Sequence, residues 1–276
     1  MPDSADEIDR QLRANDDPYL DPRWGVLANK VGARTRQELA DAENDLVEVR
    51  ALELAAKPVK PTFDENHLRA IHRRLFGDVY EWAGERRTVN TRKADDQSAP
   101  FFPAQRFQVG VPGTFEQIAE RNFRPGMPMD EFVNKLTRTY DEVNHLHLFR
   151  EGNGRSQRIF LSQLAAHAGY SIDWDAVHGD RNDVVCRAAG HGDREPMKAM
   201  LAEIVHPAEQ PHPAAADRAS RTPKVERAAA PARQRLSDRA HAYVARTDRA
   251  ANERAQAAKA DPPSIGRQVD GDQLGQ

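Results

Sequence analysis

Apolar residues recur every three or four positions through most of the first 206 residues, and this period limits the fold more than any other feature. It matches the turn of an α-helix, whereas a half-buried strand would alternate at every second residue. The first run opens with Thr35 and Glu38, which have the spacing of a helix capping box. Five helices are expected: from the Thr35 cap to Ala56, after Asp64 through Leu75, from Asp130 through Val143, over Ser156–Ala168, and from Asp193 through Ile204.

Two short extended runs, RRTVNTRK and APFFP, interrupt the helical pattern between the second and third expected helices. The polar residues DDQ between them are typical of a turn. We therefore expect a small β-hairpin over residues 87–102. The predicted fold class is mainly α, a helical bundle with this hairpin laid on it.

The composition changes near His206. Residues 207–276 hold 18 alanines and 7 prolines in 70 positions, and only seven large apolar residues. Because so little apolar area cannot offset the entropy lost on folding, this tail is predicted to be disordered or transiently helical. A partner-binding or delivery segment is the alternative. The expected organisation is an N-terminal segment (1–34) that packs on the core, a folded domain (35–206) and the tail (207–276).

Charge and hydropathy narrow the functional class. The net charge is −3 and the mean hydropathy is −0.79. Neither a direct nucleic-acid partner nor a membrane partner is expected, since no apolar run approaches the roughly 20 residues that cross a bilayer. The acidic N-terminus lacks the apolar stretch of a secretory signal, and the single cysteine, Cys186, cannot form an internal disulfide. These features predict a cytoplasmic protein.

The residues that suggest chemistry are concentrated at 144–158, NHLHLFREGNGRSQR. Gly152 and Gly154 allow a tight turn and a close approach of the backbone to a ligand. The turn leads into a helix N-terminus, where free N–H groups favour an anion. Arg155 and Arg158 share the first helical turn, and planar guanidinium groups in that position suit phosphate oxygens.

Two further side chains complete a reactive set. Glu151 offers a hard oxygen ligand beside the anion site, which is what Mg²⁺ on a polyphosphate needs. His147 is the candidate base, because a histidine is largely neutral at pH 7 and can accept a proton. A base, a cation ligand and a phosphate site within twelve residues indicate nucleotidyl or phosphoryl transfer. Leu148 and Phe149 are expected to anchor the loop in the core.

Each of these residues has a commoner structural explanation when it is taken alone. A GNG sequence is usually only a turn, and two arginines three positions apart usually lie on a solvated helix face. A single histidine is more often a packing residue than a base. The complete set, in this order and directly before a helix, favours the chemical interpretation.

The segment HLFREGNGRSQR closely resembles the active-site motif of the Fic family, HPFx(D/E)GNGRxxR. It departs from that motif at Leu148, where the family usually has proline, and this position affects loop stiffness rather than a reacting group. The segments DPYLDPRWGVLANKVG, LRAIHRRLFGDVYEWAGERRTVN and LAAHAGYSIDW also resemble the flanking regions of Fic toxins. The resemblance covers roughly residues 17–205 and assigns 35–206 as a Fic (Fido) domain.

The resemblance implies transfer of AMP from ATP to a Ser, Thr or Tyr hydroxyl of a target protein, with release of pyrophosphate. His147 would deprotonate the hydroxyl and Glu151 would hold Mg²⁺. Asn153 and the amides around Gly152, Gly154 and Arg155 would form the anion site. Arg155 would contact the β-phosphate and Arg158 the γ-phosphate. Asn144 would support the loop. The hairpin from Arg87 to Phe102 resembles the Fic flap, which clamps the target by strand addition, with Thr91 and Lys93 where it meets the nucleotide.

Family resemblance also suggests partners. Short bacterial Fic toxins point to DNA gyrase or topoisomerase IV subunits as targets, and to a small antitoxin whose inhibitory helix, (S/T)xxxE(G/N), places a glutamate against Arg158. Within this chain only Thr222 and Glu226 have that spacing, and Arg227 follows them instead of Gly or Asn. The prediction is therefore a separate antitoxin.

Two alternatives remain open at this point. Relatives with an altered motif act as kinases or transfer phosphocholine, whereas the intact GNGR here favours AMP transfer. A catalytically silent binding module on the same scaffold is the other alternative, although the presence of His147, Glu151 and Arg155 argues against it.

Overall fold

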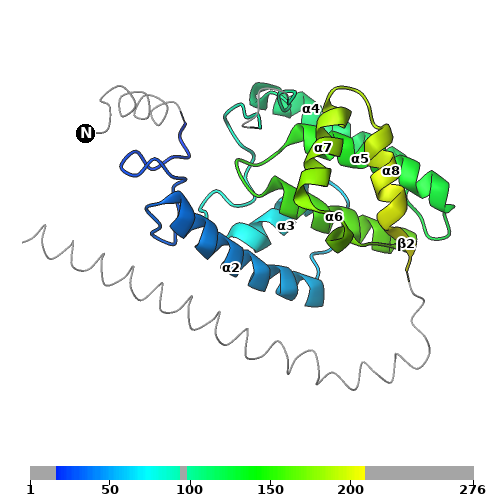
Figure 1. Ribbon diagram of the computed structural model, residues 1–276, viewed down its shortest axis with the longest axis horizontal. Helices are drawn as coiled ribbons and strands as arrows, with labels where there is room; N and C mark the ends of the chain where they lie inside the picture. Colours follow the sequence, from blue (N-terminus) through cyan, green and yellow to red (C-terminus); the bar gives the residue numbers. More distant parts are fainter. Residues whose placement is uncertain (1–16, 94–97, 209–276) are drawn as a thin grey trace, which may run out of the picture.

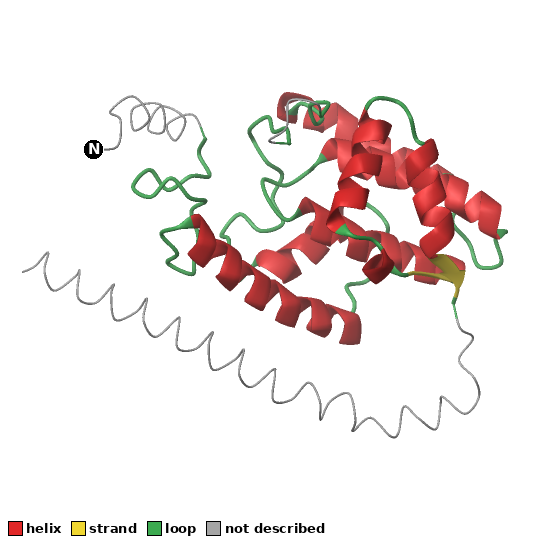
Figure 2. Ribbon diagram, viewed as in Figure 1, coloured by secondary structure: helices red, strands yellow, loops and turns green. Residues whose placement is uncertain are grey.

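The computed structural model describes residues 17–93 and 98–208. These residues contain seven α-helices and one two-stranded antiparallel sheet, so the prediction of a mainly α fold is confirmed (Figure 2). The predicted tail and the Thr222–Glu226 pattern lie outside the described residues. None of the described helices combines the length and hydrophobicity that a bilayer span requires.

The first two helices begin where their capping residues predict. Helix α2 (Arg36–Ala56) has a complete capping box, in which the Thr35 side chain accepts from the backbone N–H of Glu38 and the Glu38 side chain accepts from the backbone of Thr35. Helix α3 (Glu65–Phe76) is capped by Asp64, whose carboxylate accepts from the His67 N–H at 2.8 Å.

The next predicted helices are present, with shifted starts. Helix α5 (Met129–Leu146) follows Pro128, and helix α8 (Glu195–Ile204) begins two residues after Asp193. Helix α6 (Asn153–Ala168) begins three residues before the predicted Ser156. The reason is Gly152, whose left-handed backbone (φ 79°) ends the turn, so that Asn153, Gly154 and Arg155 already belong to the helix.

The sequence pattern missed helices α4 (Phe107–Glu120) and α7 (Gly179–Gly190). Helix α4 contains Gly110, Pro112 and Gly113, which normally indicate a break. Gly110 is there for packing, because a Cβ atom at this position would lie 2.2 Å from the Phe102 ring. Helix α7 has few large apolar residues to mark its period.

The only strands in the described residues lie elsewhere than expected. They are β1 (Tyr170–Ile172) and β2 (Val205–Pro207), which pair antiparallel with Tyr170 opposite Pro207. In the predicted hairpin at 87–102, the described arms form no strands and share one backbone bond, from the N–H of Phe101 to the carbonyl of Thr91, at 3.4 Å. The arms bond mainly to the loop after α5 instead, which is the physical reason for the difference.

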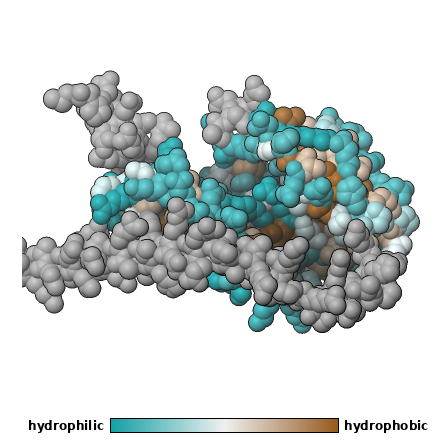
Figure 3. Space-filling view, turned by 60° about the horizontal axis from the view of Figure 1, so that its bottom comes forward, coloured by the Kyte–Doolittle hydropathy of each residue, from teal (hydrophilic) through white to brown (hydrophobic). Residues whose placement is uncertain are grey.

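Helix α6 lies in the middle of the bundle. It packs against α3 on one side, with α2 beyond it, and against α5 on the other, with α7 and α8 beyond (Figure 1). Two 3₁₀ turns, η1 (Ala104–Arg106) and η2 (Trp174–Ala176), link neighbouring elements. Val26 and Val31, which precede α2, are buried in the same apolar core. Most of the visible described surface is hydrophilic, with smaller hydrophobic areas within it (Figure 3).

Candidate active site

The loop between α5 and α6 is held rigidly by its own residues. His147 ends α5 in a left-handed conformation (φ 43°). The side chain of Asn153 then closes the loop, because it accepts from the Phe149 N–H at 2.9 Å and donates to the Phe149 carbonyl at 2.8 Å. Leu148 and Phe149 are 1% and 0% exposed, which confirms their predicted role as core anchors.

The imidazole of His147 lies against the flap, of which the structure describes residues 87–93 and 98–102. Its ring stacks on Phe101 with a centroid distance of 3.6 Å. Burial, followed by the positive charge of Arg87, lowers the pKa of His147 to about 3, while a hydrogen bond to the backbone of Asn144 acts in the opposite direction. Its Nδ1 atom is buried and has no hydrogen-bond partner among the described residues. The imidazole is therefore neutral at pH 7, and none of the described residues occupies this nitrogen.

The first turn of α6 has free backbone N–H groups, as the predicted anion site requires. The N–H groups of Asn153, Gly154 and Arg155 precede the first helical hydrogen bond, which runs from Ser156 to Gly152. Gly154 is exposed, so the backbone there is open to a ligand. The Asn153 side chain is already bonded within the loop, so its contribution to an anion site would come from its backbone.

The two motif arginines differ in their surroundings. Arg158 has no hydrogen-bond or ion-pair partner in the part of the chain that the structure describes. Arg155 instead pairs with Glu43 of α2, lies 3.4 Å from the side-chain oxygen of Asn44, and rests over the Phe76 ring at 4.8 Å. Arg155 is thus held in place, whereas Arg158 is unpaired among the described residues.

Sequence reasoning missed Glu43. This carboxylate is 7% exposed, and it also accepts a hydrogen bond from the buried Tyr80 hydroxyl. A signal was present, because Glu43 lies between Leu39 and Val47 at four-residue steps, on the buried stripe of α2. A charged residue on such a stripe indicates a buried partner of opposite charge.

Glu151 lies at the mouth of the anion site. One carboxylate oxygen accepts from the Gly152 N–H at 2.9 Å and lies 3.8 Å from Arg155. The side chain is 46% exposed, so the second oxygen is open to a cation. Within residues 17–93 and 98–208 no group of three or more His, Cys, Asp or Glu could hold a metal. A Mg²⁺ ion at Glu151 would therefore take its other ligands from phosphate and water, as this ion commonly does.

A second buried histidine, also missed from the sequence, supports the loop from below. The Nδ1 atom of His72 accepts from the Gly84 N–H at 2.8 Å, so its Nε2 atom carries the proton and donates to the Glu151 carbonyl at 2.9 Å. Burial lowers the pKa of His72 to about 4, which keeps this arrangement at neutral pH. The ring stacks against Phe149 at 3.8 Å.

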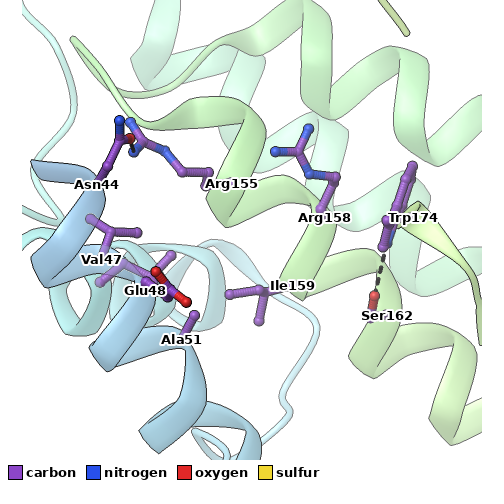
Figure 4. A pocket seen from close by; sticks show the side chains of 10 residues that line it. Asn44, Val47, Glu48, Ala51, Arg155, Arg158, Ile159, Ser162 and Trp174 are labelled. Atoms are coloured by element: carbon purple, nitrogen blue, oxygen red, sulfur yellow. Dashed lines mark hydrogen bonds between the residues drawn. The ribbon is translucent and has the colours of Figure 1, made fainter. Parts of the chain in front are cut away.

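A groove of about 360 Å³ runs between α2 and α6 beside the anion site. Both motif arginines lie along one edge of it, with Arg155 next to Asn44 (Figure 4). Its walls are largely apolar, and Trp174 at one end is fixed by a 2.9 Å hydrogen bond to Ser162. The groove thus combines apolar walls with the two arginines on one edge and the carboxylate of Glu48 on the α2 side.

The predicted flap residues lie beside His147. Thr91 has a buried hydroxyl without a partner among the described residues. Lys93 pairs with Asp183 of α7, and its charge is near enough to contribute to the lowered pKa of His147. The structure therefore brings both residues to the edge of the proposed site, while Lys93 is directed toward α7.

We expect Gly152→Ala to lower the free energy of unfolding by roughly 2 kcal/mol or more, because it forces a left-handed alanine and overpacks the site. A Cβ atom there would lie 2.4 Å from the Phe76 ring. Gly154→Ala is the control, since its Cβ would meet only Arg158, at 3.8 Å. Urea unfolding measures both variants, and equal stabilities would contradict the close-approach explanation.

Comparisons with known proteins identify the family. Residues 62–165 match the family described as Fic/DOC. The chain is 35% identical over 192 residues to the protein adenylyltransferase VbhT of Bartonella schoenbuchensis, covering 70% of this chain and 40% of VbhT. It is 31% identical over 189 residues to the probable protein adenylyltransferase Fic of Escherichia coli, covering 68% of this chain and 92% of that protein.

Solved structures show the same fold. The BepC protein of Bartonella tribocorum, with bound AMPPNP, superposes with a TM-score of 0.64 at 26% identity, covering 69% of this chain and 97% of that one. A Fic domain from Bartonella quintana with bound ADP gives a TM-score of 0.63 at 27% identity, covering 69% and 95%. Both structures hold an adenine nucleotide.

Proposed function

This chain belongs to the Fic/DOC family, and we propose that it is a protein adenylyltransferase that moves AMP from ATP to a Ser, Thr or Tyr hydroxyl of a target protein. One juxtaposition carries the proposal. A neutral histidine with an unpaired ring nitrogen lies on the loop that opens an anion-binding helix, and that helix presents the unpartnered Arg158. The names of the relatives and the nucleotides in the related structures support it.

In the proposed reaction the target hydroxyl oxygen attacks the α-phosphorus of ATP. A new P–O bond forms to the target, the bond from the α-phosphorus to the bridging oxygen of the β-phosphate breaks, and pyrophosphate leaves. The hydroxyl proton passes to His147. The amides around Gly152–Arg155 hold the phosphates, with Arg155 at the β-phosphate, Arg158 at the γ-phosphate and Asn144 supporting the base from α5.

Mg²⁺ would be held by Glu151, whose outer oxygen is open to the site. Bound there, the ion would neutralise charge on the α- and β-phosphates. Arg155 would bind the same pyrophosphate, because its pairing with Glu43 uses only part of its five-donor guanidinium group. Thr91 and Lys93, on the flap, would contact the nucleotide from the opposite side.

Labelled ATP tests this proposal. ATP labelled on the α-phosphate should label one or more proteins of a bacterial lysate, and ATP labelled on the γ-phosphate should label none. The reverse result would indicate a kinase. No label from either, at a concentration at which the chain binds ATP, would indicate a binding module.

We further propose that the chain acts in the cytoplasm as the toxin of a toxin–antitoxin pair, with DNA gyrase or topoisomerase IV subunits as targets. The groove between α2 and α6 supports an inhibitory partner helix, because its apolar walls adjoin Arg158, where a glutamate would compete with phosphate. Expression of the chain alone should stop growth of a bacterial host, whereas His147→Ala should not. If the wild-type chain is harmless and the Glu226→Gly variant is toxic, the chain inhibits itself instead.

A further inference from the structure

Arg87, at the start of the flap, is a buried arginine without an acidic partner in the described residues. Its side chain is only 2% exposed. Burial lowers the pKa of Arg87 to about 10, so the group still carries its charge at pH 7. A buried charge is costly unless its donors are satisfied, so its contacts show what it does.

All of its contacts are with backbone carbonyls and one ring. The guanidinium donates to four carbonyl oxygens, at 2.6–3.2 Å, which are those of Val89, Phe102, Leu146 and His147. The backbone N–H of Arg87 adds a fifth bond, to Leu148, and its guanidinium lies over the Phe107 ring at 4.8 Å. One side chain therefore connects the end of α5 with both arms of the flap.

These contacts control how the flap covers the base. Phe102, whose carbonyl accepts from Arg87, donates its own N–H to His145 at 2.9 Å. The preceding residue, Phe101, carries the ring that stacks on His147. The positions of His147 and of the Phe101 ring that covers it thus both depend on the guanidinium group of Arg87.

The charge of Arg87 also acts on His147. The charged groups that affect this imidazole are Arg87 and Lys93, and both disfavour its protonation. Lys93 is compensated by its pairing with Asp183 of α7, whereas Arg87 has no such partner among the described residues. His145, on the same element as the base, is exposed. Of the two positive charges that disfavour protonation of His147, Arg87 therefore has the larger effect and lacks an acidic partner among the described residues.

We propose that Arg87 is a positioning residue, which fixes the base loop to the flap through its carbonyl contacts. Its charge acts on His147 as a secondary effect, beside burial. The inference rests on the proposed function for its catalytic meaning. The contacts of Arg87 with the flap and the base loop are present in the protein without substrate. Arg87 has two effects, one of geometry and one of charge; R87K removes the first alone, and R87Q removes both, so the difference between the two variants reports the charge.

Two substitutions separate these effects. R87K keeps the charge and loses the fork, so kcat should fall tenfold or more while the pH at which His147 titrates stays unchanged. R87Q loses the charge, so His147 should become protonated roughly one pH unit closer to neutrality. KM for ATP should change less than threefold in both, because Arg87 does not touch the phosphate site. Ring resonances in the full chain, assigned by their loss in His147→Ala, report the titration.

R86Q is the matched control. Arg86 is the neighbouring residue, and it pairs with Glu65 of α3 rather than with the base loop. Its kcat and the titration of His147 should match wild type.

Unchanged kcat in R87K, or an unchanged His147 titration in folded R87Q, would overturn the inference. If R87Q does not fold, R87K alone decides. Failure of the wild-type chain to transfer AMP would refute the proposed function and leave the titration result interpretable.

Discussion

Replacing His147 with alanine is expected to lower AMP transfer by about 10²–10⁴-fold while ATP binding remains intact. The base acts only when the hydroxyl proton leaves, so its removal affects the transition state rather than nucleotide binding. The phosphate site on α6 does not include the imidazole. Initial rates with α-labelled ATP and calorimetric ATP binding measure the two effects separately.

His145→Ala is the control for this experiment. Its exposed side chain lies two residues from the base and meets the Phe102 ring edge-on at 5.8 Å, while its backbone carbonyl, which the variant keeps, accepts from the Phe102 N–H. It should transfer AMP at near the wild-type rate. Equal rates for His147→Ala and wild type would show that another group takes the proton.

The surroundings of His147 also predict a pH profile. Its pKa is lowered to about 3, so the neutral base persists far below the ordinary histidine value. The activity of the wild-type chain should therefore not decline through pH 6.5, as it would with a solvated histidine base. A half-maximal rate near pH 6.5 would mean that the base titrates as an exposed group.

Glu151→Ala is expected to remove most of the activity, about a hundredfold or more, together with its dependence on Mg²⁺. The cation would supply several kcal/mol of charge stabilisation, and Glu151 is the only carboxylate within the loop. Transfer rates over a Mg²⁺ titration measure both changes.

Glu81→Ala serves as its control, because that carboxylate is 84% exposed and makes only a long contact with Lys30. It should retain the wild-type rate and Mg²⁺ midpoint. Unchanged, Mg²⁺-dependent activity in Glu151→Ala would place the cation on other residues.

Much of the candidate site was predictable because its residues are neighbours in the chain. The turn at Gly152, the helix start and the two arginines depend on local backbone geometry, which acts over three or four residues. The same is true of α2 and α3, whose starts follow from Thr35 and Asp64. Leu148 and Phe149 were placed in the core from their apolar character alone.

The residues that hold this site in place could not be predicted in the same way. Glu43 meets Arg155 across 112 positions, His72 meets the Glu151 carbonyl across 79, and Arg87 meets the His147 carbonyl across 60. Such contacts depend on which helix faces pack together, and short-range spacing carries no information about that.

The incorrect predictions have the same origin. The flap residues have the sequence of a hairpin, yet their described backbone groups bond to the end of α5, to the loop that follows it and to the Arg87 side chain, which leaves few of them for cross-strand pairing. Gly110 resembles a helix break, yet it lies inside α4, where the Phe102 ring leaves no room for a side chain. Local propensity thus determined the reactive loop and most helices, whereas long-range packing, through burial and hydrogen bonding, determined its supports and its cover.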